Sequence, residues 1–461
     1  MLHNPAKLQV IFALPLSVKD FYLLLLQSLT ERGTPCPHTQ DHRLRVRLVP
    51  TRMDRDHLLQ LRIFDLNCWG IRYLSKLQQE RIELIGDVLS QEGFDLALLQ
   101  EVWSEKDYWG LKKKLCARYP SSHYFKSGVI GSGLCIFSKH QILDTFLYQY
   151  SVNGYPYMFQ HGDWFGGKSV GLVVLKIQGI VFNVYVTHLH AEYCREKDAY
   201  LSHRVVQAWE LGQFIQHTSK GADVVLLGGD LNMHSEDVGV RLLRGWAGLR
   251  DSFIAAEKVV GCEDGSTLLP ANRFTSKKEL KCYPQGIRID YILYKSMSQY
   301  EVRCNSHETT TGTTPSKDIP YSDHEAVMVT LSVARKLPEE ELNHPTIEPV
   351  LVDILNEARM EVRVGLHSAE RQQYSCGRMA VLAVLLLLMQ GAMGLSSMFG
   401  GALQQPFPKF SFSLLSLLAV LVLLLSTGLY LFHTIEVKVL QRTEDQMRLA
   451  LQTLQDKISS G

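Results

Sequence analysis

The sequence has no marked excess of charge of either sign and no closely spaced cysteine pairs. Its 461 residues include 48 Lys and Arg against 47 Asp and Glu. Strong nonspecific binding to nucleic acid needs a basic surface, so no nucleic-acid partner is expected. The nine cysteines are scattered, with no Cys-x-x-Cys pair. An odd number of scattered cysteines argues against a disulfide framework and favours reduced thiols in a domain that faces the cytosol.

The N-terminus lacks the unbroken apolar core and the small-residue cleavage site of a signal peptide. Its apolar runs, 10–16 and 21–26, are interrupted by charged residues, and a polar segment rich in Arg, His and Pro follows them. We interpret residues 1–55 as a disordered extension, with Met53 as a candidate for the true start. A cleaved or anchoring N-terminus is the alternative.

Short apolar runs alternate with helical patterns between residues 61 and 334, which is typical of an α/β domain. We expect strands at 61–66, 96–99, 134–137, 170–177, 180–186, 224–227, 289–294 and 326–331. The two residues Gln178-Gly179 between two such runs predict a hairpin. Apolar residues at helical spacing predict helices over 77–89 and 200–217. Because hairpins and crossovers both occur, the sheet is expected to be mixed.

Two long apolar segments, 379–399 and 410–432, follow this region. Each has about 20 residues, enough to cross about 30 Å of hydrocarbon, so we predict a two-helix transmembrane hairpin rather than two buried helices. More basic residues lie on the outer flanks than in the turn, which predicts that both flanks and the preceding domain face the cytosol. We interpret 335–378 as a linker with a short amphipathic helix, and 433–461 as an amphipathic tail.

Six short polar motifs stand at the edges of the apolar runs and supply the groups of a hydrolytic site. They are Leu66-Asn67-Cys68-Trp69, Leu99-Gln100-Glu101, Thr187-His188-Leu189-His190, Gly229-Asp230-Leu231-Asn232, Arg288-Ile289-Asp290-Tyr291 and Ser322-Asp323-His324. Polar side chains at strand ends reach a shared crevice in layered α/β proteins. Carboxylate and amide oxygens suit Mg²⁺, and Glu101 and Asn67 are the candidate ligands.

The same motifs supply candidates for acid–base catalysis. Asp230 and Asn232 lie two residues apart and would face one side of a strand, where they can orient a water or a phosphate oxygen. His324 beside carboxylates is the candidate general base. Asp290 is the candidate to orient the second nitrogen of that imidazole.

Two further histidines, His188 and His190, follow the run 180–186. Both can project from one face of the strand. We expect His188 to donate a proton to the leaving group or to hold the phosphoryl charge, and His190 to be structural. Taken singly, each motif also fits a strand cap, a turn or a structural histidine. Only the ordered set favours a catalytic site.

The ordered set resembles the DNase I-like endonuclease/exonuclease/phosphatase superfamily. More narrowly, residues 61–331 resemble the neutral, Mg²⁺-dependent sphingomyelinases. The segments that carry this resemblance are 63–70 (IFDLNCWG), 131–139 (GSGLCIFSK), 153–157 (NGYPY) and 187–193 (THLHAEY). The two apolar segments are similar to the C-terminal hairpin of some members. The resemblance implies a four-layer α/β sandwich with two mixed sheets inside, followed by a two-helix transmembrane hairpin.

For Asp230, Asn232, His324, Asp290 and His188, the resemblance implies the same roles as those given above. It makes Glu101 the main Mg²⁺ ligand and adds Asp323 as a second-shell or metal-side carboxylate. It also implies that Asp163 and Lys168, which flank Gly166-Gly167, form a pair that sets a loop for catalysis. Without the resemblance, the two would be interpreted as solvated charges on a glycine-rich turn.

Aromatic side chains gather in the presumed loop that contains Tyr155, Tyr157, Trp164 and Phe165. Aromatic residues favour the headgroup region of a bilayer. The loop is therefore interpreted either as a membrane contact or as a buried hydrophobic loop.

The combined expectation is a membrane-anchored phosphodiesterase that cleaves sphingomyelin to ceramide and phosphocholine, with lysophospholipids as further candidate substrates. One rival is a nuclease or inositol-phosphate phosphatase of the same superfamily; the balanced charge and the hairpin argue against the nuclease. A rival of another class is a non-catalytic membrane scaffold, against which the complete set of motifs argues. The expected location is the endoplasmic reticulum or the plasma membrane, and no oligomeric state is predicted.

Overall fold

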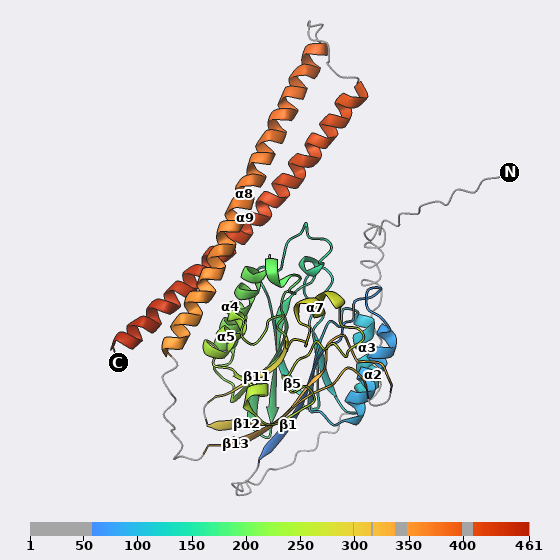
Figure 1. Ribbon diagram of the computed structural model, residues 1–461, viewed down its shortest axis with the longest axis vertical. Helices are drawn as coiled ribbons and strands as arrows, with labels where there is room; N and C mark the ends of the chain where they lie inside the picture. The colour runs from blue at the N-terminus through green and yellow to red at the C-terminus, as the bar shows by residue number, and fades with distance from the viewer. Residues whose placement is uncertain (1–57, 298, 315–316, 337–347, 399–408, 461) are drawn as a thin grey trace, which may run out of the picture. The chain divides into compact units, whose positions relative to one another are not determined.

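The computed structural model describes residues 58–297, 299–314, 317–336, 348–398 and 409–460 (Figure 1). The expected N-terminal extension, the candidate start Met53 and the turn between the two apolar segments lie outside the described residues.

Two β-sheets form the centre of the fold. In spatial order, the first consists of β10 (Ala256–Val260), β12 (Tyr300–Thr309), β13 (Val327–Arg335), β1 (Leu59–Asn67), β2 (Leu96–Gln100), β4 (Cys135–Ser138) and β3 (Ser121–Tyr124). The second consists of β5 (Ile142–Gln149), β6 (Ser169–Ile177), β7 (Ile180–His188), β8 (Val224–Asp230), β11 (Asp290–Ser296) and β9 (Arg250–Asp251). Every one of the eight expected strands is present.

Strand pairing is mixed in both sheets. Strand β1 is parallel to β2 and antiparallel to β13, and β8 is parallel to β7 and antiparallel to β11. Strands β6 and β7 form the expected hairpin. Gln178 and Gly179 have φ of 49° and 91°. Two consecutive positive φ values are typical of the type I′ turn, whose twist matches that of the strands.

Helices cover the outer face of each sheet and complete four layers. The helices α2 (Gln78–Gln91) and α3 (Glu105–Leu115) pack on the first sheet, and α4 (Leu201–Thr218) and α5 (Val238–Gly245) pack on the second. A third apolar cluster fills the space between the sheets. Because both faces of each sheet are covered, the central strands are nearly continuous apolar runs. The expected four-layer sandwich is confirmed. The short helices α6 (Ser252–Ala255) and α7 (Lys277–Cys282) lie between strands.

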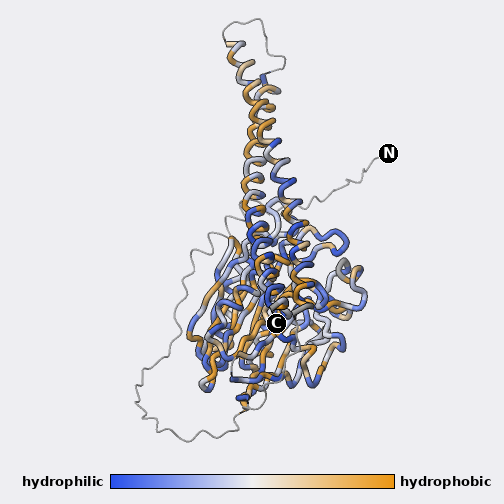
Figure 2. Tube along the Cα trace, turned by 90° about the vertical axis from the view of Figure 1, so that its left-hand side faces the viewer, coloured by the Kyte–Doolittle hydropathy of each residue, from blue (hydrophilic) through white to orange (hydrophobic). Residues whose placement is uncertain are grey.

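The C-terminal region consists of two long helices, α8 (Glu348–Met398) and α9 (Lys409–Ser460), which lie side by side. Each contains an 18-residue window of high mean hydropathy, 2.1 and 2.5, and could cross a membrane by length and composition. Figure 2 shows apolar residues gathered in one half of the pair and polar residues in the other. The segment 335–378, interpreted above as a linker, is thus helical from Glu348 onward, and the tail continues α9 without a break.

The polar halves of these helices pack against the domain that contains the two sheets. We call them the stem: residues 350–378 of α8 and 433–458 of α9. Buried residues of the stem form one apolar cluster with Val205 and Trp209 of α4 and with Leu242 of α5. The stem therefore continues the packed interior of the domain, because its apolar stripe is covered by α4 and α5.

Candidate functional site

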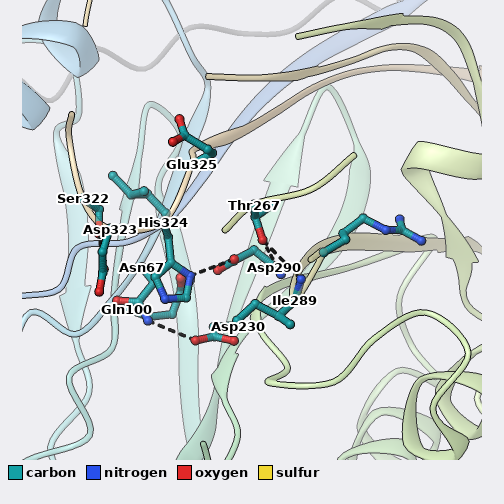
Figure 3. Close-up of polar contacts among 12 residues, drawn as sticks. Asn67, Gln100, Asp230, Thr267, Ile289, Asp290, Ser322, Asp323, His324 and Glu325 are labelled. Carbon is teal, nitrogen blue, oxygen red and sulfur yellow. Dashed lines mark hydrogen bonds and ion pairs between the residues drawn. The ribbon is translucent and has the colours of Figure 1, made fainter. Parts of the chain in front are cut away.

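Three neighbouring strands of the second sheet place polar side chains in one row. In the sheet register, His188 of β7 stands beside Asp230 of β8, and Asp290 of β11 stands opposite Asp230. The Nε2 atom of His188 lies 3.3 Å from Oδ2 of Asp230. His324 approaches from the loop before β13. Its Nδ1 lies 2.9 Å from Oδ2 of Asp290 (Figure 3). One carboxylate oxygen each of Asp230 and Asp290 and one imidazole nitrogen of His324 all lie within 4.8 Å of one another.

Asn67 joins this row to the first sheet. Its Nδ2 donates to Oε1 of Glu101 over 3.1 Å and to Oδ2 of Asp230 over 3.0 Å. Its Oδ1 accepts a hydrogen bond from the Trp69 amide. The assigned amide orientation therefore turns the nitrogen, not the oxygen, toward the two carboxylates. In this arrangement Asn67 holds Glu101 and Asp230 together, which differs from the expectation that its oxygen faces a cation.

Glu101 follows β2 in a left-handed backbone conformation, with φ of 55°. Such a conformation costs a non-glycine residue about 1–3 kcal/mol and persists where the surroundings enforce it. Its carbonyl accepts from the Gly70 amide, and the Val102 amide donates to the Gly133 carbonyl. These two backbone hydrogen bonds hold the turn at Glu101. Its side chain is half-buried at the site.

The His324–Asp290 pair sets which imidazole nitrogen is free. Since a carboxylate only accepts, Nδ1 of His324 carries the proton, and Nε2 remains for a reactant. Thr267 fixes the start of β11, because its hydroxyl accepts from the amides of Ile289 and Asp290 over 3.2 and 3.3 Å (Figure 3). Burial disfavours charge on His324, but Asp290, followed by Asp323 and Asp230, outweighs burial and raises the pKa of His324 well above its usual value.

Asp230 is the most highly connected acid of the row. Besides Asn67 and His188, its Oδ1 accepts from the Asn232 amide over 2.8 Å. Burial favours the neutral acid, but His188, His324 and Lys168 together hold the pKa of Asp230 below its usual range. Asn232 lies just beyond β8 with φ of 49°, and its Nδ2 donates to the Leu189 carbonyl. Its side chain thus ties the ends of β7 and β8 together.

Asp163 and Lys168 form a buried ion pair at 3.1 Å, with side chains 9% and 2% exposed. These exposures exclude two solvated charges on a turn. The Lys168 ammonium also donates to the Leu189 carbonyl, and the Tyr193 hydroxyl donates to Asp163. Although burial acts in the opposite direction, Lys168 and His190 lower the pKa of Asp163.

Two further candidates of the motifs, Asp323 and His190, are not members of the row. Asp323 accepts a hydrogen bond from the Ser322 hydroxyl. Among the described residues, the group of acids and imidazoles within 4.8 Å includes neither Asp323 nor Glu101. His190 is fully buried and stacks on Tyr200 at a ring separation of 4.1 Å. Burial, the main cause, lowers the pKa of His190 to about 3.

The sequence signature of the Endonuclease/Exonuclease/phosphatase family matches residues 66–324. Sphingomyelin phosphodiesterase 2 of Mus musculus is 49% identical, over 84% of this chain and 91% of the relative. Its Homo sapiens counterpart is 48% identical, over 85% and 92%. A putative neutral sphingomyelinase of Caenorhabditis elegans is 38% identical, over 71% and 79%. The chain belongs to the neutral sphingomyelinase family.

Two residues of this neutral sphingomyelinase site were not singled out by sequence reasoning. Asp65 of β1 is fully buried and accepts from Gln100 over 2.9 Å. Burial, aided by Asp290 and Asp230, raises the pKa of Asp65 well above its usual value. Its position two residues before Asn67, on the same face of β1, was an available signal. Arg81 of α2 was not recognisable, because it belongs to no motif. Its guanidinium donates to the carbonyls of Cys68 and Trp69 in the first motif and of Tyr321, the residue before the last motif.

The aromatic loop of the sphingomyelinase is divided between buried and exposed rings. Tyr155 is 8% exposed, and its ring lies near Phe432 of α9. Tyr157 is half-buried and donates to Gln372 of α8 over 3.0 Å. The expectation of a bilayer contact is therefore wrong for Tyr155, which contacts the protein. Trp164 is 39% exposed and Phe165 is half-buried.

A divalent cation fits the chemistry of these residues. Glu101, Asp230 and Asp290 supply carboxylate oxygens, which suit a hard cation. Oδ1 of Asp290 is buried and has no hydrogen-bond partner within the described part of the chain. A buried carboxylate oxygen without a donor is costly, so a cation or a water beside it would satisfy it.

Replacing Asp290 with Asn is expected to move the acid limb of the kcat/KM profile to lower pH. A general base must be neutral, so the rate rises as pH increases through the pKa of His324. Burial lowers that pKa, and Asp290 is the strongest of the groups that outweigh burial. Its removal therefore lowers the pKa, while the maximal rate falls by roughly 10²-fold because the tautomer is no longer selected. Asp144→Asn, at an exposed position of β5, is the control. A limb that moves to higher pH would contradict the pairing.

Proposed function

We propose that this protein hydrolyses sphingomyelin to ceramide and phosphocholine in a Mg²⁺-dependent reaction at a membrane surface. The observation that carries the proposal is the His324–Asp290 pair standing within 4.8 Å of Asp230 in a member of the neutral sphingomyelinase family. This is the arrangement of an oriented base beside a phosphate site.

The reaction follows from the roles of these side chains. Nε2 of His324 takes a proton from a water, and the resulting hydroxide attacks phosphorus in line with the ceramide oxygen. The bond from phosphorus to that oxygen breaks, and His188, held by Asp230, supplies a proton to the departing ceramide or stabilises the phosphoryl charge. Asn232 and Asp230 orient the water and the phosphate. Mg²⁺, when bound, neutralises phosphate charge and stabilises the charge that develops in the transition state. Glu101 is the main ligand in this proposal, with Asp323 on the metal side and Asn67 positioning the carboxylates.

The membrane placement rests on the two long helices. We infer that their apolar halves cross the bilayer of the endoplasmic reticulum or the plasma membrane as a hairpin. The domain then lies on the cytosolic side of that membrane. The eight cysteines among the described residues are all free, which supports a reducing compartment. In this proposal Trp164 and Phe165 contact the headgroup region, since rings of this kind favour the interface.

Phosphocholine release from the full chain in detergent micelles tests the proposal. Sphingomyelin, phosphatidylcholine and a lysophospholipid are offered separately, each after chelation and again after Mg²⁺ is restored. We expect release from sphingomyelin that is lost on chelation and recovered with Mg²⁺. Release from phosphatidylcholine alone, or release that survives chelation, would contradict the substrate or the metal, respectively.

A further inference from the structure

The stem is hydrogen-bonded to α4 at three successive points of α9. Glu436 contacts His203, Arg442 donates to Glu210, and Gln446 accepts from the indole of Trp209; all three distances are 2.9 Å. The opposite side of α4 packs on the second sheet through residues such as Ala208 and Leu211. Helix α4 is therefore held between the stem and the sheet that carries the row of polar residues.

The first of these points is a buried carboxylate between two imidazoles. Glu436, His203 and His433 are 3%, 0% and 2% exposed. One oxygen of Glu436 lies 2.9 Å from Nε2 of His203, and the other lies 2.6 Å from Nδ1 of His433. A buried carboxylate is costly unless it is paired, so this cluster is a specific construction and not a surface contact.

His203 connects Glu436 to the backbone at Gly154, beside the site. Its Nδ1 accepts a hydrogen bond from the Gly154 amide over 3.0 Å. Because Nδ1 accepts, the proton of the neutral imidazole is on Nε2, and that proton is donated to Glu436. Glu436 therefore selects the tautomer that can hold Gly154. Gly154 has φ of 74°, and a Cβ there would lie 2.4 Å from Nε2 of His190, so the chain passes directly against the end of β7.

The side chains of Asn153 and Gln207 connect the backbone around Gly154 to the site. Asn153 donates to the carbonyl of Gly166 over 2.9 Å and also to that of Asp163. Gln207, one turn after His203 on α4, donates to the Val152 carbonyl and accepts from the His190 amide, both over 2.8 Å. The segment 151–168 and the strand end that carries His188 are thus fastened to the helix that the stem holds.

We propose that Glu436, assisted by His433, is a positioning residue for the hydrolysis: it fixes His203 in the tautomer that holds Gly154, and thereby the segment 151–168 beside the phosphate site. This inference rests on the proposed function. It means that the stem supports the active site itself, in addition to attaching the enzyme to a membrane. Catalysis in micelles, where attachment to a bilayer has no effect, then still depends on α9.

The test compares full-length Glu436→Ala with Glu444→Ala in detergent micelles. Glu444 accepts from Arg359 of α8 over 2.6 Å, and among the described residues it makes no hydrogen bond to α4. We expect Glu436→Ala to lower kcat at least about tenfold at nearly unchanged KM, since small misplacements of reacting groups cost up to about 10²-fold. Glu444→Ala is expected to keep the wild-type kcat. Glu436→Gln retains an oxygen that accepts from Nε2 of His203, so it should recover most of the loss.

Hydrogen exchange at the Gly154 amide gives a readout that is independent of turnover. Exchange is expected to speed up in Glu436→Ala, and not in Glu444→Ala, while both variants unfold at temperatures near that of the wild type. An unchanged Gly154 exchange rate in Glu436→Ala, or equal kcat losses in the two variants, would overturn the inference. If the wild-type chain released no phosphocholine, the proposed function would fail, and the Gly154 exchange rate would still decide whether α9 orders this segment.

Discussion

Glu101→Ala is expected to abolish Mg²⁺-dependent turnover, with a loss on the order of 10³-fold or more, because charge stabilisation by a bound metal contributes several kcal/mol at the transition state. The fold should survive. Within the described part of the chain, the hydrogen-bond partners of the carboxylate are Asn67 and, at 3.4 Å, Trp103. Alanine also carries a Cβ, so the left-handed backbone costs about as much in the variant as in the wild type.

Turnover as a function of Mg²⁺ concentration, together with thermal unfolding, measures both sides of this prediction. Glu105→Ala is the matched control, because Glu105 stands at the start of α3 and pairs with the exposed Lys126. It should change neither quantity appreciably. A folded Glu101→Ala enzyme with near wild-type activity would remove Glu101 from the metal site.

His324→Ala is expected to lower kcat by roughly 10²–10⁴-fold, the usual scale for losing a general base. Adding imidazole to the assay should restore part of the rate, since it supplies a base where the ring has been removed. His140→Ala, at the turn after β4, is the control and should retain full activity. If His324→Ala retained its rate while His188→Ala lost it, the base would be the other imidazole of the row.

Much of the fold was predictable because burial leaves a clear sequence pattern. The strands β8 and β7 are covered on both faces, so they consist almost wholly of apolar residues. The strands that sequence reasoning missed carry mixed patterns. The strand β5 lies at a sheet edge and is half exposed, and β12 contains many polar residues. Their pairing is enforced by neighbouring strands and not by their own composition.

The sequence predicted the site residues that lie at strand ends, but not those that support them from the helices. Each motif marks where a strand stops, and parallel or antiparallel pairing brings those ends together. The sequence contains no comparable signal for Arg81, which acts through backbone carbonyls, or for Glu436, whose partner on α4, His203, lies 233 positions earlier. The sequence also predicted only a short amphipathic helix within a linker over 335–378, whereas α8 is helical from Glu348 and its apolar stripe packs on α4 and α5.

The row formed by His188, Asp230 and Asp290 has a consequence for which changes the enzyme tolerates. These groups meet because three strands are in register, not because loops bring them together. Side chains alternate between faces along a strand, so a shift of one position turns every following side chain over. Deleting one residue between Val224 and Gly229 would carry Asp230 out of the row and point it toward the opposite layer. Such an indel should therefore harm catalysis more than many substitutions within the site, whereas loops between the strands can vary in length as long as the ladder is kept.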